Sequence, residues 1–404
     1  MSPAPLGNRD LMRAHNRSII LNAIKSHGDI SRAEIARLTG LSPATVSAIT
    51  AELIAENLVL EHAEGDSSGG RPPILLRLNP SGGFVVGIKV TEQHLIGALT
   101  DLTAAVITKQ VFDLPNHTLE DVLEGIINIV TRLTHIGGVR KKQLLGVGIG
   151  LAGVVDGHRG VLKYSPIFGW HEVPLRDILQ ARLRVPVYVD NDVNTLTLSE
   201  KWFGAARTVE NFLVITLGRG VGMGIVVQGQ IYRGHGGGAG EFGHIVVDPQ
   251  GPICACGGRG CLETFVADPG LLRQAQDAWQ RGELSALVTH IEDLVALAEA
   301  GDESAQRIFA RAGEVLGIQI ANLINVFDPA MVIIGGEGTR NGEWMFAPMR
   351  QAITRHVMPG LRNGTEIRID PWGDDAWARG AASLVLGELF KSPIQREAIA
   401  GSVG

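Results

Sequence analysis

The sequence predicts an α/β protein preceded by a smaller helical domain. From Phe84 onward, short apolar or β-branched runs such as GFVVGIKV, VPVYVD and AMVIIGG alternate with helical stretches and glycine turns, which is typical of α/β folds. Residues 16 to about 62 instead carry apolar side chains at helical spacing and little glycine. Because 404 residues exceed what one hydrophobic core usually serves, we expect a helical domain at 1–80 and an α/β domain at 81–404.

Composition excludes several classes of protein. The net charge is -6, so contact with nucleic acid must come from a local basic patch. The N-terminus lacks the layout of a signal peptide, and no apolar run approaches the roughly 18 residues that span a bilayer. We therefore expect a soluble cytoplasmic protein without a membrane partner. Its three cysteines cannot all pair, and in a reducing compartment clustered thiols favour a metal over a disulfide.

Two sharply capped helices are predicted near the N-terminus. In ISRAEIARLTG, Ser31 and Glu34 have the spacing of a capping box, and Gly40 suits the left-handed position after the helix. In LSPATVSAITAELIAEN, Ser42 suits the N-cap and Pro43 the first helical position. A preceding helix, NRSIILNAIKSH, completes a helix-turn-helix pattern, for which the alternative is a helical hairpin that serves packing alone.

Three observations favour DNA binding for these helices. Ser42, Thr45 and Ser47 place small polar groups on the exposed face of the second helix, where they can approach base edges. LVLEHAEGDSSGGRPPILLRLN reads as two strands around a flexible tip, from which Arg71 can reach a minor groove. Residues 1–46 also hold six basic residues against three acidic ones. The six are Arg9, Arg13, Arg17, Lys25, Arg32 and Arg37.

The three cysteines fall within one glycine-rich turn, CACGGRGCLE. Cys254, Cys256 and Cys261 supply three soft ligands, and His244 is the nearest upstream candidate for the fourth ligand of a tetrahedral Zn²⁺. Three thiolates and one imidazole leave no open coordination position, so this zinc would be structural. The alternative is that the three are buried thiols by chance.

Two carboxylates flank the predicted metal loop. Glu241 precedes His244 and Glu263 follows the last cysteine, and carboxylates can accept bidentate hydrogen bonds from a polyol. If one ring nitrogen of His244 binds zinc, the other is a donor that can face a ligand. Asn191 and Asp192 end a predicted strand, the usual ligand edge of an α/β sheet. The following helix is expected to begin after Asp192, which can then also serve as its N-cap.

Together these residues resemble the ROK family of repressors, open reading frames and sugar kinases. The resemblance covers nearly the whole chain and rests on LGRGVGMGIVVQGQIYRGHGGGAGEFGH, CACGGRGCLE, DND at 190–192, LAGVVD at 151–156 and the SSGGRPP tip. It implies an actin-like, ribonuclease-H-like fold of two α/β lobes with sugar bound between them. One lobe would span about 81–200 plus a C-terminal helix at about 375–392, and the other about 201–374 with the zinc loop.

The resemblance also implies roles for individual residues. The sugar-contacting positions of the family fall on Asn191, Asp192, Glu241, His244 and Glu263. Its zinc ligands fall on His244, Cys254, Cys256 and Cys261. In the kinases, the aspartate at position 192 is the base that deprotonates the attacking sugar hydroxyl. Ile167 stands where many relatives have Asn, which puts a sugar contact from that loop in question.

The phosphate loops depart from the kinase pattern. Where ROK kinases carry an Asp-x-Gly-Gly-Thr turn, the Asp, both glycines and the Thr are replaced here by Lys89, Thr91, Glu92 and Gln93. A glutamate repels phosphate, and side chains at the glycine positions block close backbone approach. In the second loop, LGRGVG, Arg219 replaces the usual Thr, whereas VIIGGEG at 332–338 keeps the appearance of the adenosine-side turn. We interpret this as a retained fold that has lost its nucleotide site and its catalysis.

The sequence therefore predicts a sugar-responsive transcriptional regulator of the xylose, glucose or N-acetylglucosamine repressor type. Its partners would be operator DNA and a monosaccharide effector, and palindromic half-sites imply a homodimer or homotetramer. The alternatives are an ATP-dependent sugar kinase with an appended DNA-binding domain and a regulator whose pocket binds a partner protein. The sugar, the operator sequence and the direction of the response stay open.

Overall fold

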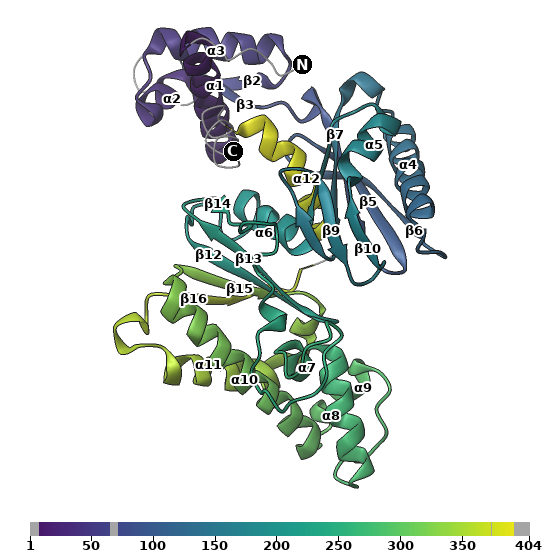
Figure 1. Ribbon diagram of the computed structural model, residues 1–404. Coiled ribbons are helices and arrows are strands. Elements are labelled where there is room, and N and C mark those ends of the chain that lie inside the picture. Colours follow the sequence, from purple (N-terminus) through teal and green to yellow (C-terminus); the bar gives the residue numbers. More distant parts are fainter. Residues whose placement is uncertain (1–7, 65–71, 373, 392–404) are drawn as a thin grey trace. The chain divides into compact units, whose positions relative to one another are not determined.

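The N-terminal region of the computed structural model, which describes residues 8–64, 72–372 and 374–391, is a winged helix (Figure 1). Its helices are α1 (Asn8–His27), α2 (Arg32–Thr39) and α3 (Pro43–Ala55). Its sheet has the order β1-β3-β2, formed by β1 (Ile30–Ser31), β3 (Ile74–Leu78) and β2 (Val59–Glu64), and all pairs are antiparallel. The predicted helix-turn-helix and the two strands of the wing are thus confirmed.

The predicted caps of α2 and α3 form as expected. Ser31 and Glu34 make both hydrogen bonds of the capping box, and Gly40 adopts the left-handed conformation with φ 70°. The Ser42 hydroxyl accepts from the Thr45 N–H at 3.1 Å. The buried side of α3 consists of Val46, Ile49, Thr50 and Leu53.

The chain as a whole divides into two compact units. The first holds the winged helix up to Ile149, then Arg176–Val189 and the chain from Ala381 onward. The second holds Gly150–Leu175 and Asp190–Gly380. The helix α12 (Asp374–Phe390) runs from the second unit into the first. The domain and lobe boundaries expected from the sequence stay predictions.

A five-stranded sheet with the order β11-β7-β4-β5-β6 forms the α/β part of the first unit. Three of its strands form an antiparallel meander: β4 (Phe84–Val90), β5 (His94–Asp101) and β6 (Val106–Asp113). The sheet continues beside β4 with β7 (Leu144–Leu151) and then β11 (Val187–Asn191). Helix α4 (Leu119–Ile136) packs on β5 and β6, and α5 (Leu175–Leu183) precedes β11. A Cβ on Gly148 would meet the Ala381 carbonyl at 1.8 Å, so α12 lies directly against β7.

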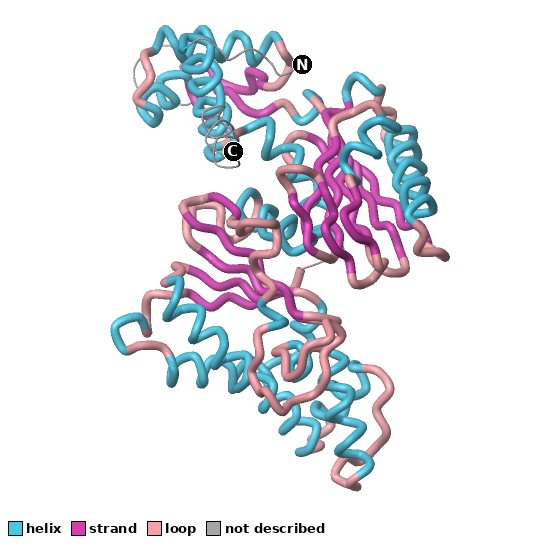
Figure 2. The backbone as a smooth tube through the Cα atoms, viewed as in Figure 1, coloured by secondary structure: helices cyan, strands magenta, loops and turns pink. Residues whose placement is uncertain are grey.

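A second five-stranded sheet, β14-β13-β12-β15-β16, forms the centre of the second unit (Figures 1 and 2). Strands β12 (Phe212–Leu217), β15 (Met331–Gly335) and β16 (Glu366–Ile369) run parallel, whereas β13 (Val221–Val227) and β14 (Gln230–Ile231) complete the sheet antiparallel. A small antiparallel sheet contains β8 (Val154–Asp156), β9 (Val161–Ser165) and β10 (Trp170–Val173). Because β12 and β15 run parallel, the glycine loops that follow them lie at the same sheet edge.

The second unit also holds the helices α6 (Asp192–Trp202), α7 (Glu263–Val266), α8 (Asp268–Gln280), α9 (Ile291–Glu299), α10 (Glu303–Phe327) and α11 (Gly342–His356). Helix α6 packs on β12 and β13, whereas α8 and α9 pack on α10. The hydrophobic core lies between α10, α11 and the sheet and includes Phe309, Leu316 and Ile334, all fully buried. In α10, a Cβ on Gly313 would meet the Met345 carbonyl at 2.0 Å, so the missing side chain lets the two helices touch.

Among the described residues, no single helix is long and apolar enough to cross a membrane, and α2 and α3 meet that test of length and composition only jointly, as a pair bent by 120°.

Candidate metal and ligand site

The predicted thiol cluster forms in the segment between β14 and α7. The ligand atoms of His244, Cys254, Cys256 and Cys261 all lie within 4.8 Å of one another. The Cys254 Sγ lies 3.6 Å from His244 Nδ1, and Cys256 Sγ lies 3.7 Å from Cys261 Sγ. Four ligands around a tetrahedral Zn²⁺ with Zn–S bonds of about 2.3 Å lie about 3.8 Å apart. The cluster therefore has the chemistry and the spacing of a metal site.

Tight backbone turns bring the cysteines together. Two isolated bridges, Val246 with Cys261 and Ile253 with Arg259, pair the loop with itself. Gly260 has φ 68°, and a Cβ there would lie 1.6 Å from the Asp248 carbonyl oxygen. Only glycine fits this turn, since a side chain would collide with backbone.

The thiols differ in how readily they lose their protons. Burial raises the pKa of Cys254, and a hydrogen bond to Glu263 raises it further. Burial likewise raises the pKa of Cys261, whereas the Gly258 N–H lowers the pKa of the exposed Cys256. The buried thiols hold their protons at neutral pH, so binding of a metal cation would release protons.

Two carboxylates lie against His244, and a third, that of Asp192, is close enough for its charge to act on Glu241. Glu241 Oε2 lies 3.8 Å from His244 Nε2, and Glu263 Oε1 lies 3.6 Å from Nδ1. Removal from water raises the pKa of Glu241, and the charges of Asp192 and Glu263 raise it further, although His244 opposes them. The Glu241 side chain still has 47% of its surface exposed. Partly dehydrated acids that repel one another but stay reachable from solvent are typical of ligand sites.

The start of α6 differs from the prediction by one residue. The N-cap is Asn191, not Asp192, and helix α6 begins at Asp192. The Asn191 side-chain oxygen accepts from Val193 N at 2.8 Å and Asn194 N at 3.3 Å, and its amide donates to the Gly153 carbonyl at 3.0 Å. The prediction was wrong because Asn and Asp are almost equally good caps. As the first helical residue, Asp192 keeps its carboxylate at the positive end of the helix dipole.

Sequence reasoning missed a buried ion pair next to this turn. Asp190, 1% exposed, accepts from Arg233 Nε at 2.8 Å and Arg233 Nη2 at 2.6 Å. The two residues are 43 positions apart, and no local sequence pattern connects them.

Three of the four candidate DNA-contacting residues lie at the start of α3, with Ser42 as its N-cap. Ser42 and Ser47 are exposed and Thr45 is half-buried, consistent with an accessible face, whereas Arg71 lies outside the described residues. The excess of basic residues is weaker than the sequence implied, because three of the six arginines and lysines form ion pairs within the domain. These pairs are Arg13 with Glu52, Arg17 with Glu56 and Arg32 with Glu61.

Hydrogen bonds within the turn between β4 and β5, and from the segment after β6, hold this turn, where the resemblance places the first kinase phosphate loop. The Thr91 hydroxyl accepts from His94 N at 2.9 Å, the Glu92 carbonyl contacts the His117 ring at 2.6 Å, and the Gln93 carbonyl accepts from Leu114 N at 2.7 Å. The turn is therefore a packed hairpin end rather than an open cradle of N–H groups.

The two glycine loops at the edge of the second sheet are also covered by side chains. A Cβ on Gly218 would lie 2.6 Å from Glu337 Oε2, and one on Gly335 would lie 2.4 Å from the Trp372 ring. The carboxylate of Glu337 thus stands against a loop that would have to accept phosphate in a kinase.

The chain thus combines an N-terminal winged helix with an α/β body that carries a Cys₃His loop. Residues 85–388 match the ROK family model, and residues 15–59 match that of winged helix-turn-helix DNA-binding domains. The chain belongs to the ROK family.

Individual relatives share different lengths of the chain. The xylose repressor of Caldicellulosiruptor bescii is 30% identical over 396 residues, which cover 96% of this chain and 99% of that protein. The crystal structure of a ROK family transcriptional regulator, a homolog of the E. coli MLC protein, is 29% identical with a TM-score of 0.85 over 94% of this chain and 97% of that one. A ROK family glucokinase from Streptomyces griseus, in complex with glucose and AMPPNP, is 29% identical with a TM-score of 0.65 and covers 75% of this chain and 99% of its own.

Proposed function

We propose that this protein is a sugar-responsive transcriptional repressor of carbohydrate-utilisation genes. The observation that carries the proposal is the extent of the matches. The repressor from Caldicellulosiruptor bescii aligns with 96% of the chain, whereas the Streptomyces griseus glucokinase aligns with 75%. The winged helix, matched separately at residues 15–59, is the part that a DNA-binding regulator requires and a kinase does not.

The effector site in this proposal is the group of acids around His244. Glu241, Glu263 and Asp192 offer carboxylate oxygens that can accept from the hydroxyls of a monosaccharide, and His244 offers a ring nitrogen. Asn191 contributes less than expected, because its oxygen and part of its amide already serve the cap and Gly153. These groups recognise hydroxyls that glucose, xylose and N-acetylated hexosamines share.

The metal in this proposal is a structural Zn²⁺ held by His244, Cys254, Cys256 and Cys261, since thiolate and imidazole ligands in a closed tetrahedral set are those that zinc prefers. When bound, it supplies a rigid anchor for the loop. His244 faces this ligand set through Nδ1 and Glu241 through Nε2, so the imidazole joins the metal loop to the acids. Orientation of a ligand-contacting group by its neighbour is a usual role of such a histidine.

We propose that the chain has no kinase activity, with Asp192 as the equivalent of the kinase base. The closed turn at Thr91 and the Glu337 carboxylate against Gly218 both disfavour triphosphate. Incubation with Mg²⁺-ATP and a panel of aldoses should give no sugar phosphate above background, measured by coupled ADP release. Turnover in the usual kinase range, about 1–100 per second, would reverse this part of the proposal.

The DNA side of the proposal uses α3 and the wing. Ser42, Thr45 and Ser47 would approach base edges, Arg71 would enter a minor groove, and the remaining contacts would go to phosphates. A two-fold operator calls for a homodimer or homotetramer. The cytoplasm is the location that fits operator DNA as the partner. Sugar changes operator affinity only if it binds the DNA-competent and the DNA-incompetent arrangements with different affinity.

Calorimetric titration with a monosaccharide panel tests the effector site directly. At least one aldose should bind with a stoichiometry of one per chain, and Glu241→Gln should weaken binding of that sugar, because one acceptor oxygen becomes a donor. Absence of binding by every sugar would remove the effector site and favour a partner protein as the signal.

A further inference from the structure

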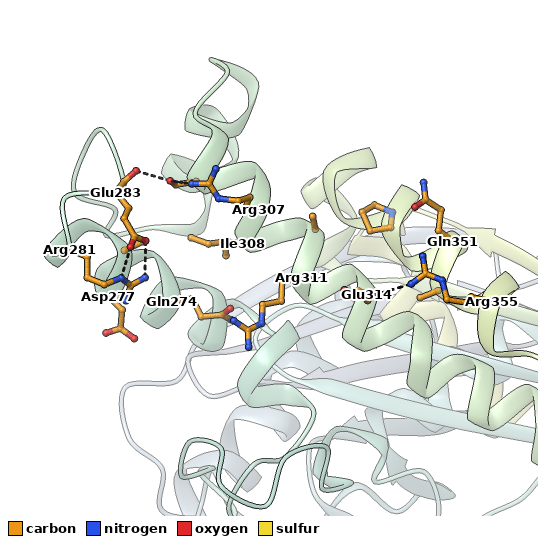
Figure 3. Close-up of a pocket in the computed structure, with 15 residues that line it drawn as sticks. Gln274, Asp277, Arg281, Glu283, Arg307, Ile308, Arg311, Glu314, Gln351 and Arg355 are labelled. Carbon is orange, nitrogen blue, oxygen red and sulfur yellow. Dashed lines mark hydrogen bonds and ion pairs between the residues drawn. The ribbon is translucent and has the colours of Figure 1, made fainter.

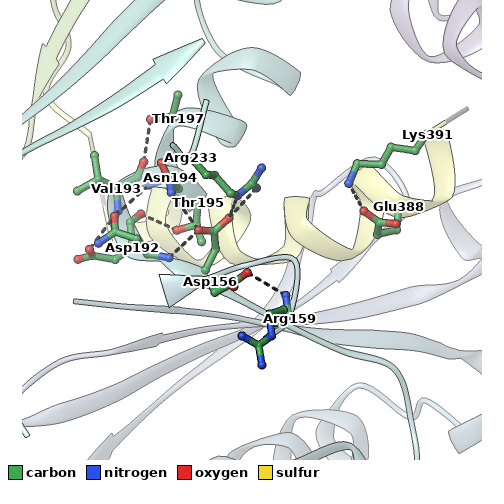
Figure 4. A network of polar contacts seen from close by, with 12 residues as sticks. Asp156, Arg159, Asp192, Val193, Asn194, Thr195, Thr197, Arg233, Glu388 and Lys391 are labelled. Atoms are coloured by element: carbon green, nitrogen blue, oxygen red, sulfur yellow. Dashed lines mark hydrogen bonds and ion pairs between the residues drawn. The ribbon is translucent and has the colours of Figure 1, made fainter. Parts of the chain in front are cut away.

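A buried ion pair lies beside the start of α6, where Figure 4 shows Arg233 next to Asn194 and Asp192. Asp190 is 1% exposed and the Arg233 side chain 18%. One oxygen of Asp190 accepts from Arg233 Nε and Nη2 at 2.8 and 2.6 Å. The other accepts from Asn191 N at 2.8 Å and from the Asn194 side-chain amide at 3.0 Å. The Asp190 carboxylate therefore accepts from four donors and is almost completely shielded from solvent.

The pair joins two segments that both carry candidate sugar ligands. Asp190 immediately precedes Asn191 and Asp192. Arg233 begins the loop that ends at Glu241, and its carbonyl accepts from Ala239 N at 3.2 Å, which closes the loop at its base. The Arg233 side chain thus binds the end of β11, while its backbone carbonyl binds the loop that leads to Glu241.

The surroundings leave the pair little freedom. A Cβ on Gly157 would lie 3.2 Å from both Arg233 Nε and Asp190 Oδ2, so the β8–β9 turn closes over them. Within the loop, a Cβ on Gly237 would lie 2.1 Å from the Val155 carbonyl, and one on Gly240 2.0 Å from the Met223 carbonyl. The loop is packed against backbone on two sides, and a side chain inserted there would displace it.

An ion pair buried in this way adds little to the free energy of folding, but it fixes the relative position of the two segments that it joins. Removal of two charges from water costs free energy that their attraction only partly returns, and the fork of an arginine fixes direction as well as distance. A hydrophobic pair in the same place would cost less. A fully hydrogen-bonded ion pair between two segments that carry candidate sugar ligands points to positioning.

We propose that Arg233 is a positioning residue for the effector site: its ion pair with Asp190 sets the distance between the Asn191–Asp192 turn and the Glu241-bearing loop. The inference rests on the proposed function, since it deepens the same site. Arg233 itself need not touch the sugar. Loss of the pair would leave the ligand groups present but misplaced, and a small misplacement lowers affinity strongly.

The test compares Arg233→Met and Arg233→Lys with the parent, using calorimetry with whichever panel sugar the parent binds. Arg233→Met should raise the Kd of that sugar by about tenfold or more, and Arg233→Lys should recover part of the loss because it keeps the charge but not the fork. A purely structural role would lower the fraction of active protein, and hence the stoichiometry, while Kd stayed unchanged. An unchanged Kd for Arg233→Met would therefore overturn the proposal.

The control is Arg159→Met, at an exposed arginine on the β8–β9 turn of the same unit, which should leave Kd unaltered. If Arg233→Met does not fold, Asp190→Asn combined with Arg233→Met removes both charges and leaves no uncompensated carboxylate. This double variant should still show the raised Kd, and a parental Kd would contradict the proposal.

Hydrogen exchange separates this inference from the proposed function. In the absence of any sugar, amides of residues 234–241 should exchange faster in Arg233→Met than in the parent and Arg159→Met. If the parent binds no monosaccharide, the proposed function fails, but this comparison still tests whether the Asp190–Arg233 ion pair holds the loop. Equal exchange in all three proteins would refute the positioning role of Arg233 independently of the sugar.

Discussion

At the scale of single residues, the molecule places acids, imidazole and thiols in one continuous arrangement. His244 lies between the thiols and the acids, with Nδ1 3.6 Å from Cys254 Sγ and Nε2 3.8 Å from Glu241 Oε2. Any change in the metal ligands should therefore reach the acids through this ring. Metal content and ligand affinity are expected to change together rather than separately.

Replacement of Cys256 by Ser tests that connection. Cys256 is the exposed member of the cluster, so its loss removes a ligand with little damage to packing. Zinc content by atomic emission should fall, and the Kd for sugar should rise by roughly tenfold or more. Gln250→Ala, on the exposed surface of the same loop, serves as the control and should change neither. Parental sugar affinity in a zinc-free Cys256→Ser protein would disconnect the two sites.

The sequence allowed prediction of site residues where they lie close together in the chain or belong to a rare residue type. The Cys₃His set was predictable because three cysteines in eight positions leave few other uses, and the structure brings the four ligand atoms within 4.8 Å of one another. The Asp190–Arg233 pair was not, because an arginine in a glycine-rich stretch gives no sign of a partner 43 residues away. The sugar-contacting role of the acids stays a prediction.

At the scale of elements, local rules performed well at helix ends. Ser31, Gly40 and Ser42 occupy the predicted positions because caps depend on a few neighbouring residues. The same rules placed the start of α6 one residue late, since DND offers two adjacent capping residues. Local rules could not predict the ion pairs of Arg13 with Glu52 and of Arg17 with Glu56, because these pairs depend on how α1 packs on α3.

The wing is the element whose function can be tested most simply. Replacement of Arg71 by Ala should weaken operator binding by roughly tenfold, because a guanidinium inserted in a minor groove is lost. Sugar affinity should stay unchanged, since no candidate effector residue lies in the winged helix. Fluorescence anisotropy with labelled operator measures the first and calorimetry the second. Arg159→Ala is the charge-matched control, and equal DNA affinity of both variants would refute the wing assignment.

At the scale of the whole molecule, one helix belongs to both compact units. α12 starts in the unit that holds the acids, where a Cβ on Gly380 would meet the Thr195 carbonyl of α6 at 2.6 Å. It ends in the unit that holds the winged helix, where Asn22 of α1 donates to the Phe390 carbonyl at 2.9 Å. One continuous helix is thus in contact both with α6, which carries candidate sugar ligands, and with the winged helix. Fold class was predictable at this scale from the alternation of strands and glycine turns, whereas the division at Ile149 and Ala381 depends on long-range packing.

The most direct test of the central claim is operator affinity measured by anisotropy with and without each sugar of the panel, at constant salt. The account predicts that at least one monosaccharide shifts the Kd for operator by roughly 5- to 150-fold, and that Glu241→Gln abolishes the shift without altering DNA binding in the absence of sugar. Operator affinity that no monosaccharide changes, in a protein that binds those sugars, would contradict it.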